Sequence, residues 1–113
     1  MTIKEIIEVT KATLVTPNIG LSASIEHCCV CDLLSWVMAK GVADSAWITV
    51  QTHMNVIAVA SLMDMPAIIL PDGIVPEDAT VNKAVEEGIA IICSQMNAFD
   101  ICAALSHCGV KGV

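Results

Sequence analysis

The chain has 113 residues, a length that accommodates one ordinary domain but not two. Hydrophobic residues make up 56% before glycine is counted and aromatic residues only 3%, whereas average chains reach roughly 45–50% apolar residues with glycine included. This composition excludes a disordered chain, and the formal net charge of −7 excludes a nucleic-acid-binding surface. A chain of this size cannot bury so much apolar surface by itself. We therefore expect an oligomer, in the simplest case a homodimer.

The sequence also argues against contact with a membrane. The mostly apolar stretch between His53 and Asp64, residues 54–63, has ten residues, and a spanning helix needs about 20. The first residues include acids where a signal peptide would be basic, so we expect a cytoplasmic protein. In that reducing compartment, structural disulfides between the six cysteines are not expected.

The N-terminal part of the chain carries one helix signal and two strand signals. Residues 2–5 (Thr-Ile-Lys-Glu) match a capping box, in which Thr and Glu satisfy unpaired amides, so we predict a helix over residues 3–9. β-Branched residues at 12–16 predict a strand, and turn residues follow at 17–20. Apolar and polar side chains then alternate over residues 21–31, which predicts a longer strand.

Two helices with polar residues at their starts are expected next. Asp32 is a good N-cap for a helix over residues 33–39 that ends near Gly41. Thr52 can cap a helix over residues 53–63, which is apolar almost all round. A helix without a polar face belongs either to the core or to a contact between subunits.

Strand and helix signals alternate to the end of the chain. Pro76 suits the first turn of a helix that ends at Gly88, and Glu77 and Asp78 complement its dipole. The other expected elements are strands at residues 46–50, 67–70 and 89–93, and a last helix with an inner stripe of Ala98, Ile101, Cys102 and Leu105. This order predicts a single α/β domain over residues 1–113, with a mostly parallel sheet of about five strands, helices on both faces and right-handed crossovers.

Polar residues gather where the expected parallel strands end. Ligands of open α/β sheets bind outside these carboxyl ends, and helix N-termini there suit an anion. The alternative is structural: two of the residues are helix caps, the Asp-Gly pair is an ordinary turn whose glycine permits positive φ, and the others are solvated. The candidate ligand-binding residues are Asp32, Gln51, Thr52, His53, Asn55, Asp72 and Gly73, and Pro71, Ser94 and Gln95 lie at the same strand ends.

Three of the six cysteines lie in one segment with C-x-x-C spacing. On a strand, Cys28 and Cys31 point to opposite faces and cannot bind one ion. His27, Cys29 and Cys31 share a face but stand roughly 6–7 Å apart, which is loose for zinc. Cys93, Cys102 and Cys108 show no metal-ligand spacing. We expect buried thiols and no metal or other cofactor, with a metal site or redox sensing as the alternatives.

No catalytic signature occurs in the sequence. It lacks the G-x-x-x-x-G-K-[ST], G-x-G-x-x-G and G-x-S-x-G motifs, and none of the three histidines lies near a nucleophile signature. A triad assembled in space needs no such signature, so this lowers the expectation of catalysis without excluding it. We predict that the protein is not an enzyme. The alternative is a small metal-dependent or hydrolytic accessory enzyme that uses Asp32, Thr52, His53 and the cysteines.

Two segments resemble a known family. Residues 30–38, VCDLLSWVM, and residues 46–60, AWITVQTHMNVIAVA, are similar to small stand-alone members of the DRTGG domain family. The similarity continues through residues 67–76 and 86–88, and it covers about residues 1–107. It is most specific in the middle segment.

The resemblance implies an α/β module that dimerises and serves regulation or assembly. The family is similar to the N-terminal, non-catalytic domain of HPr kinase/phosphorylase, and related domains lie beside CBS modules in some pyrophosphatases and phosphotransacetylases. Stand-alone members are often encoded next to iron-hydrogenase components, which implies an accessory role there. The string that names the family is absent, and residues 70–73 take the place of the equivalent turn. Kinase activity is not implied, because the phosphate-binding loop belongs to another domain of the larger relatives.

We therefore predict a non-catalytic regulatory or assembly module that forms a homodimer. A further protein partner is expected, with an iron-hydrogenase or related redox system as the setting that the resemblance implies. A nucleotide or phosphate would bind at the strand ends through backbone amides. The net charge and the carboxylates of Asp32 and Asp72 oppose an anion, so we expect weak binding and rank a protein partner above it.

Overall fold

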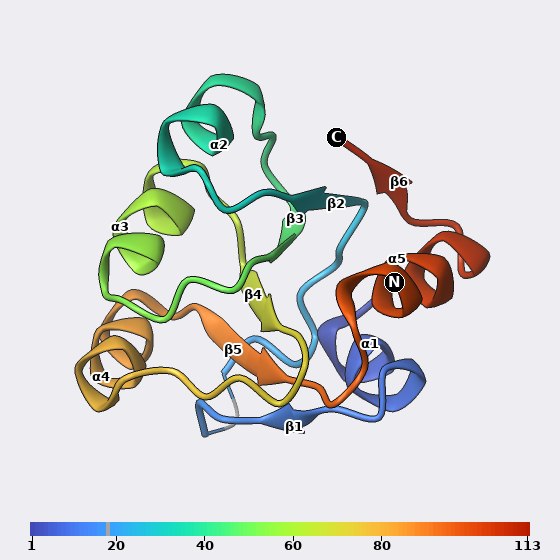
Figure 1. The fold of residues 1–113 in the computed structure, drawn as a ribbon, viewed down its shortest axis with the longest axis horizontal. Coiled ribbons are helices and arrows are strands. Elements are labelled where there is room, and N and C mark those ends of the chain that lie inside the picture. The colour runs from blue at the N-terminus through green and yellow to red at the C-terminus, as the bar shows by residue number, and fades with distance from the viewer. Residues whose placement is uncertain (18) are drawn as a thin grey trace.

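The computed structural model describes residues 1–17 and 19–113, which form a six-stranded sheet with helices on both faces (Figure 1). The strands lie in the order β1-β5-β4-β3-β2-β6, and all neighbours are parallel except β1 and β5. In chain order the elements are α1 (Ile3–Val9), β1 (Thr13–Leu14), β2 (His27–Val30), α2 (Leu34–Lys40), β3 (Ser45–Ile48), α3 (Asn55–Leu62), β4 (Ala67–Leu70), α4 (Asp78–Glu87), β5 (Ala90–Cys93), α5 (Ala98–His107) and β6 (Lys111–Gly112). The predicted class, a mostly parallel α/β sheet covered on both faces, is confirmed.

The direction of the crossovers explains which helix covers which face. From β2 to β5 each strand is added on the same side of its predecessor, and right-handed crossovers then put α2, α3 and α4 on one face. After β5 the chain returns to the far edge to place β6 beside β2, so α5 lies on the other face with α1. Figure 1 shows these two groups of helices on opposite sides of the sheet.

Side chains of the central strands alternate between two cores. On β3, Ala46 and Ile48 belong to the core under α1 and α5, whereas Trp47 belongs to the core under α2, α3 and α4. Every residue of β3 and β4 is buried. Because strands buried on both faces read as continuous apolar runs, the sequence located these strands well.

The longest predicted strand, residues 21–31, is wrong in its first half. Only His27–Val30 pairs as β2, because its neighbour β3 begins at Ser45 and offers no partner further back. Residues before β2 instead bend toward the N-terminus, where Ser24 forms an isolated bridge with Thr2. The predicted turn at residues 17–20 includes Asn18, which lies outside the described residues.

Helix boundaries confirm some of the predicted caps and correct others. The capping box of α1 is present, and Gly88 ends α4 in the left-handed region with φ +70°. Neither Asp32 nor Thr52 caps a helix: α2 follows Leu33 and α3 follows Met54, and neither has a side-chain cap. Pro76 precedes the N-cap Glu77, so α4 begins at Asp78, two residues later than expected.

The apolar helix α3 lies largely in the core. Val56, Ile57, Val59 and Ala60 are buried between the sheet and the neighbouring helices. Its last residue, Leu62, is 67% exposed. Within the described part of the chain, no helix combines the length and the apolar character needed to cross a membrane.

Candidate functional site

Asp32 and Gln51 tie together the loops that follow β2 and β3. Oδ1 of Asp32 accepts hydrogen bonds of 2.9 Å from the Thr49 hydroxyl and 2.9 Å from the Val50 amide. The Gln51 side-chain amide donates to the Asp32 carbonyl at 2.9 Å. A carboxylate that accepts two hydrogen bonds is held more firmly than one in solvent. Asp32 therefore fixes the two loops side by side instead of capping α2.

Thr52 contributes its backbone and not its hydroxyl. Its carbonyl accepts a hydrogen bond of 2.7 Å from the Thr80 hydroxyl and one of 3.4 Å from the Glu77 amide. These two bonds attach the β3–α3 loop to the first turn of α4. The partners lie 25 and 28 residues away in sequence, which is why a local capping rule assigned Thr52 to the wrong role.

His53 occupies the start of α3. Its Nδ1 atom accepts from the Asn55 amide at 3.3 Å, and its carbonyl accepts from the Val56 amide at 3.2 Å. The Ile57 and Ala58 amides donate to the Met54 carbonyl. The first amides of α3 therefore have partners within the chain. The amides at the start of α3, where the sequence suggested an anion site, are therefore already hydrogen-bonded within the protein.

Asp72 and Gly73 form a left-handed turn that joins the ends of β4 and β5. Their φ angles are +57° and +70°, as the sequence predicted for the glycine. The Asp72 amide donates to the Met96 carbonyl and the Gly73 amide to the Ser94 carbonyl, each at 2.9 Å. A Cβ on Gly73 would lie 2.7 Å from Oε1 of Gln95, so no larger side chain fits without a shift.

The turn closes the position where this fold would be expected to bind a ligand. The chain leaves β4 toward α4 on one face and leaves β5 toward α5 on the other. In doubly wound sheets such a divergence opens a crevice for ligands. Here the backbone bonds from the 72–73 turn to the loop after β5 bridge that crevice.

The seven predicted residues thus share one edge of the sheet but form three separate groups. Asp32 and Gln51 are in contact with each other, the 52–55 group is attached to α4, and the 72–73 turn is attached to the loop after β5. Three buried hydroxyl residues hold these loops: Thr49 and Thr80, which the sequence analysis missed, and Ser94, which it placed at a strand end without a role. Their signal was a lone Thr or Ser at the end of an apolar strand or in the first turn of a helix.

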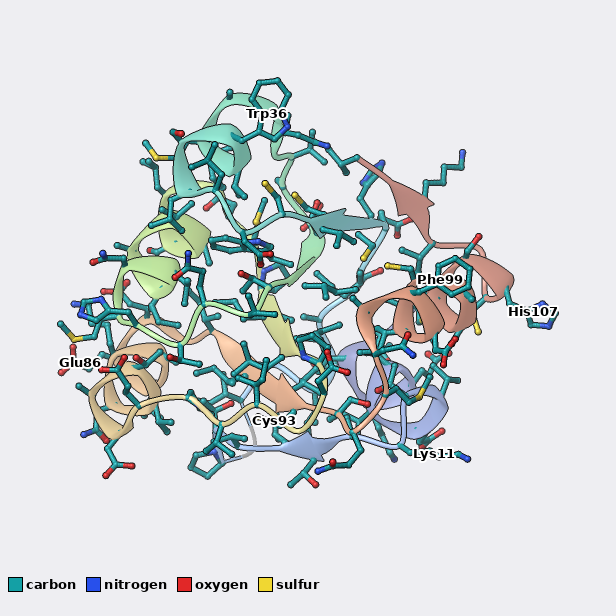
Figure 2. The ribbon with its side chains drawn as sticks, in the orientation of Figure 1. Lys11, Trp36, Glu86, Cys93, Phe99 and His107 are labelled. Atoms are coloured by element: carbon teal, nitrogen blue, oxygen red, sulfur yellow. The ribbon has the colours of Figure 1, made fainter. Side chains whose placement is uncertain are left out.

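Exposed apolar side chains follow each of the four strands from β2 to β5. The largest exposures are 81% for Phe99, 74% for Val75, 63% for Leu33 and 57% for Trp36. Figure 2 shows the Trp36 ring on the outer side of α2 and the Phe99 ring on α5. We call this set the carboxyl-edge apolar residues: Leu33, Trp36, Val50, Met54, Val75 and Phe99.

The same edge is acidic. The segments that leave the strands, residues 31–36, 49–55, 71–78 and 94–100, contain five acidic residues and neither Lys nor Arg. These residues are Asp32, Asp72, Glu77, Asp78 and Asp100. The edge therefore offers an anion neither a Lys nor an Arg side chain, and it surrounds its apolar groups with negative charge.

The cysteines differ in their environments. Cys28 and Cys29 are buried and point to opposite faces, Cys31, Cys93 and Cys102 are half-buried, and Cys108 is exposed. The expectation of buried thiols is therefore right for two residues and wrong for Cys108. Burial raises the pKa of the Cys29 and Cys93 thiols above the ordinary value. Among the described residues, no group of three or more His, Cys, Asp or Glu side chains could hold a metal ion.

Comparisons with known proteins relate the chain to others by its fold. No family model matches the sequence, and no curated protein sequence matches it. The chain is similar to a solved structure of the regulatory region of the Clostridium perfringens pyrophosphatase, with a TM-score of 0.69 and 12% sequence identity. That region contains CBS and DRTGG domains and was solved in complex with its activator, diadenosine tetraphosphate. The match covers 92% of this chain and 45% of that one, so this chain spans less than half of that regulatory region. The two chains share a fold.

Proposed function

We propose that the chain is a non-catalytic regulatory or assembly domain of the DRTGG kind, which works as a homodimer in the cytoplasm. The observation that carries the proposal is the set of carboxyl-edge apolar residues. An exposed large apolar side chain follows each of the four strands β2 to β5, on one edge of the sheet. Apolar patches rimmed by polar residues are typical of interfaces.

The chemistry of this edge favours a protein contact over catalysis. The carboxylate of Asp32 and the side-chain amide of Gln51 already serve the loops, and His53 serves the start of α3. By contrast, Trp36 and Phe99 are aromatic residues without a covering neighbour. Large aromatic side chains contribute most to binding at protein interfaces. We therefore assign them the role of anchors.

We extend the proposal to a second protein partner, a component of an iron-hydrogenase or related redox system. The support is the resemblance of residues 30–38 and 46–60 to stand-alone DRTGG domains, together with the shared fold of the pyrophosphatase region. The partner would meet the same edge. Because this edge carries five acidic residues and neither Lys nor Arg, a basic surface fits it best.

A nucleotide is the second candidate ligand, and the observation that favours it is the diadenosine tetraphosphate bound by the pyrophosphatase region. In this chain the amides at the start of α3 and in the 72–73 turn have internal partners, and acidic residues surround them. We therefore propose that nucleotides and phosphate bind weakly. Thermal denaturation with millimolar diadenosine tetraphosphate tests this, since a ligand of the folded state raises Tm. A large rise in Tm would reverse the ranking.

Sedimentation of the full chain at increasing concentration and ionic strength tests the dimer. Two acidic edges repel each other, and salt screens exposed charges, so the homodimer should tighten as salt is added. Complexes with a basic partner should weaken instead. A chain that remains monomeric at high micromolar concentration in both low and high salt would overturn the homodimer.

A further inference from the structure

A cavity of about 250 Å³ lies between β2, β6 and α5. Its walls come from the strand next to the sheet edge and from the inner side of the last helix. The lining is mostly apolar, with two thiols and one hydroxyl: Cys28, Val30, Cys102, Leu105, Ser106, Val110 and Gly112. None of these residues takes part in the loops described above.

The two thiols of this cavity come from opposite walls, Cys28 from β2 and Cys102 from α5. Cys28 points from β2 into the core under α5, and Cys102 packs against that core from the helix. Burial raises the pKa of Cys28 to about 12, and the neighbouring Cys102 thiol adds to this shift. Burial also raises the pKa of Cys102, and its proximity to the Cys28 thiol opposes that shift. Cys102 is less buried than Cys28, so a solute that enters the cavity reaches the Cys102 sulfur more readily.

The other cysteines are kept apart from this pair. Cys29 belongs to the opposite core, and Cys31 and Cys93 pack against that same core. Cys108 follows the end of α5 and is exposed. In the part of the chain that the structure describes, Cys28 and Cys102 are the two cysteines that line one cavity.

We propose that Cys28 and Cys102 form a dithiol site that a hydroperoxide oxidises to an intramolecular disulfide. The Cys102 thiolate attacks the O–O bond of hydrogen peroxide, which gives a sulfenic acid at Cys102 and releases water once the leaving hydroxide takes up a proton. The Cys28 sulfur then attacks the Cys102 sulfur, the S–O bond breaks, and the hydroxyl leaves as water with the Cys28 proton. In sum, two thiols and one peroxide give one disulfide and two waters.

The cavity provides the space that this reaction needs. A water molecule occupies about 30 Å³ in the liquid, so a peroxide with two oxygen atoms fits within the walls. Thiolates are scarce at buried cysteines, so the oxidation is slow compared with that of an exposed reactive cysteine. The site responds to sustained oxidant and not to a brief pulse.

The bond would attach the C-terminal part of the chain to the sheet. Strand β6 pairs with β2 at only two positions, one of them Cys28 opposite Gly112. A link from Cys28 to Cys102 joins β2 to α5 across 74 residues of chain. It restricts the unfolded state, so the oxidised protein should melt at a higher temperature than the reduced protein.

The positions of the lysines allow a direct test on the full chain. Trypsin cuts after lysine, and Cys28 falls in the peptide 12–40 and Cys102 in the peptide 84–111. In the variant with C29S, C31S, C93S and C108S, each peptide keeps one cysteine. After treatment with hydrogen peroxide and alkylation of free thiols, we expect the two peptides joined and the intact mass lower by about 2 Da, the two hydrogens lost.

Single variants keep the test decisive if the fourfold variant does not fold. In the otherwise unchanged chain, Cys28→Ser and Cys102→Ser should each abolish the link between peptides 12–40 and 84–111 and the rise in Tm. The matched control Cys108→Ser should retain both. Cys28 and Cys102 that stay alkylatable under peroxide would overturn the proposal. So would a link that survives Cys28→Ser. This test is independent of the homodimer, because the cavity lies within one chain.

Discussion

The two ends of the sheet expose different kinds of side chain to solvent. At the amino edge, the segments that precede β2, β3, β4 and β5 surround a hollow of about 510 Å³. Four carboxylates line it, from Glu26, Asp44, Asp64 and Glu87. At the carboxyl edge, the polar side chains bind each other and the apolar side chains are exposed.

The hollow at the amino edge is therefore not the part of the molecule to which we assign binding. Ligands of open α/β sheets gather at carboxyl ends, yet here the larger hollow lies at the opposite edge and its acids are exposed or bonded to neighbours such as Ser61 and Lys83. Water solvates carboxylates well, so the amino edge needs no partner. Exposed aromatic and aliphatic groups gain from being covered. The carboxyl edge is therefore the one that we assign to binding.

The largest effect on stability is expected from Asp32→Ala. This change removes the acceptor of two hydrogen bonds and leaves the hydroxyl proton of the buried Thr49 without an acceptor. We expect the free energy of unfolding to fall by about 1–2 kcal/mol, measured by urea denaturation.

The matched control lies at the other edge. Glu87 also has two side-chain partners, Ser61 and Lys83, but neither partner is buried, so Glu87→Ala should cost about 0.5 kcal/mol or less. Equal losses for the two variants would show that the Asp32 contacts are no firmer than an ordinary surface interaction.

A smaller effect is expected from the two glycines in matched conformations. Gly73 and Gly88 both have φ +70°, but a Cβ on Gly73 meets the Gln95 side chain, and one on Gly88 meets open space. Gly88→Ala should cost about 1 kcal/mol from backbone strain alone. Gly73→Ala should cost more, and Gln95→Ala in the same chain should remove the excess. Identical costs in urea denaturation would contradict the packing of the 72–73 turn.

The smallest effect concerns pH and the start of α1, next to the amino edge. The Thr2 hydroxyl and amide hold the pKa of Glu5 below its ordinary value of 4.5. A depressed folded-state pKa stabilises the protein above the unfolded pKa, and the gain disappears as pH falls through the folded value. The urea midpoint of Glu5→Gln should therefore lie slightly below that of the unchanged chain at pH 7, and the difference should shrink as the pH falls through the folded-state pKa. Thr2→Val also removes the acceptor of the Glu5 amide, so its urea midpoint should stay lower at acidic pH as well. A Glu5→Gln difference that does not shrink as the pH is lowered would contradict the capping box.

The success of sequence-based prediction follows the range of the interactions. Strands β3 to β5 were found because they are buried on both faces and read as apolar runs. The α1 cap and Gly88 were found because both depend on residues within one turn. The extra strand β6 was missed, since it has two residues and its pairing with β2 depends on a return across the sheet.

The candidate site shows the opposite case. The edge that carries it was predicted, because parallel strands end together. The roles of Asp32 and Thr52 were not, since their partners Thr49, Val50 and Thr80 lie 17 to 28 residues away. A capping rule considers only the next few residues. The exposure of Trp36 and Phe99 depends on tertiary packing, so no local sequence pattern predicted it.

The central claim, that the carboxyl edge is the interface, is tested most directly by a matched pair of exposed leucines. Leu33 is 63% exposed at the carboxyl edge, and Leu62 is 67% exposed at the far end of α3. Sedimentation equilibrium should show a dimer for the unchanged chain and for Leu62→Ser. The double variant Leu33→Ser/Trp36→Ser should dissociate about 30-fold more readily, because truncating an interface anchor costs about 2 kcal/mol. Equal dissociation constants for the two variants, or a monomeric unchanged chain, would contradict the claim.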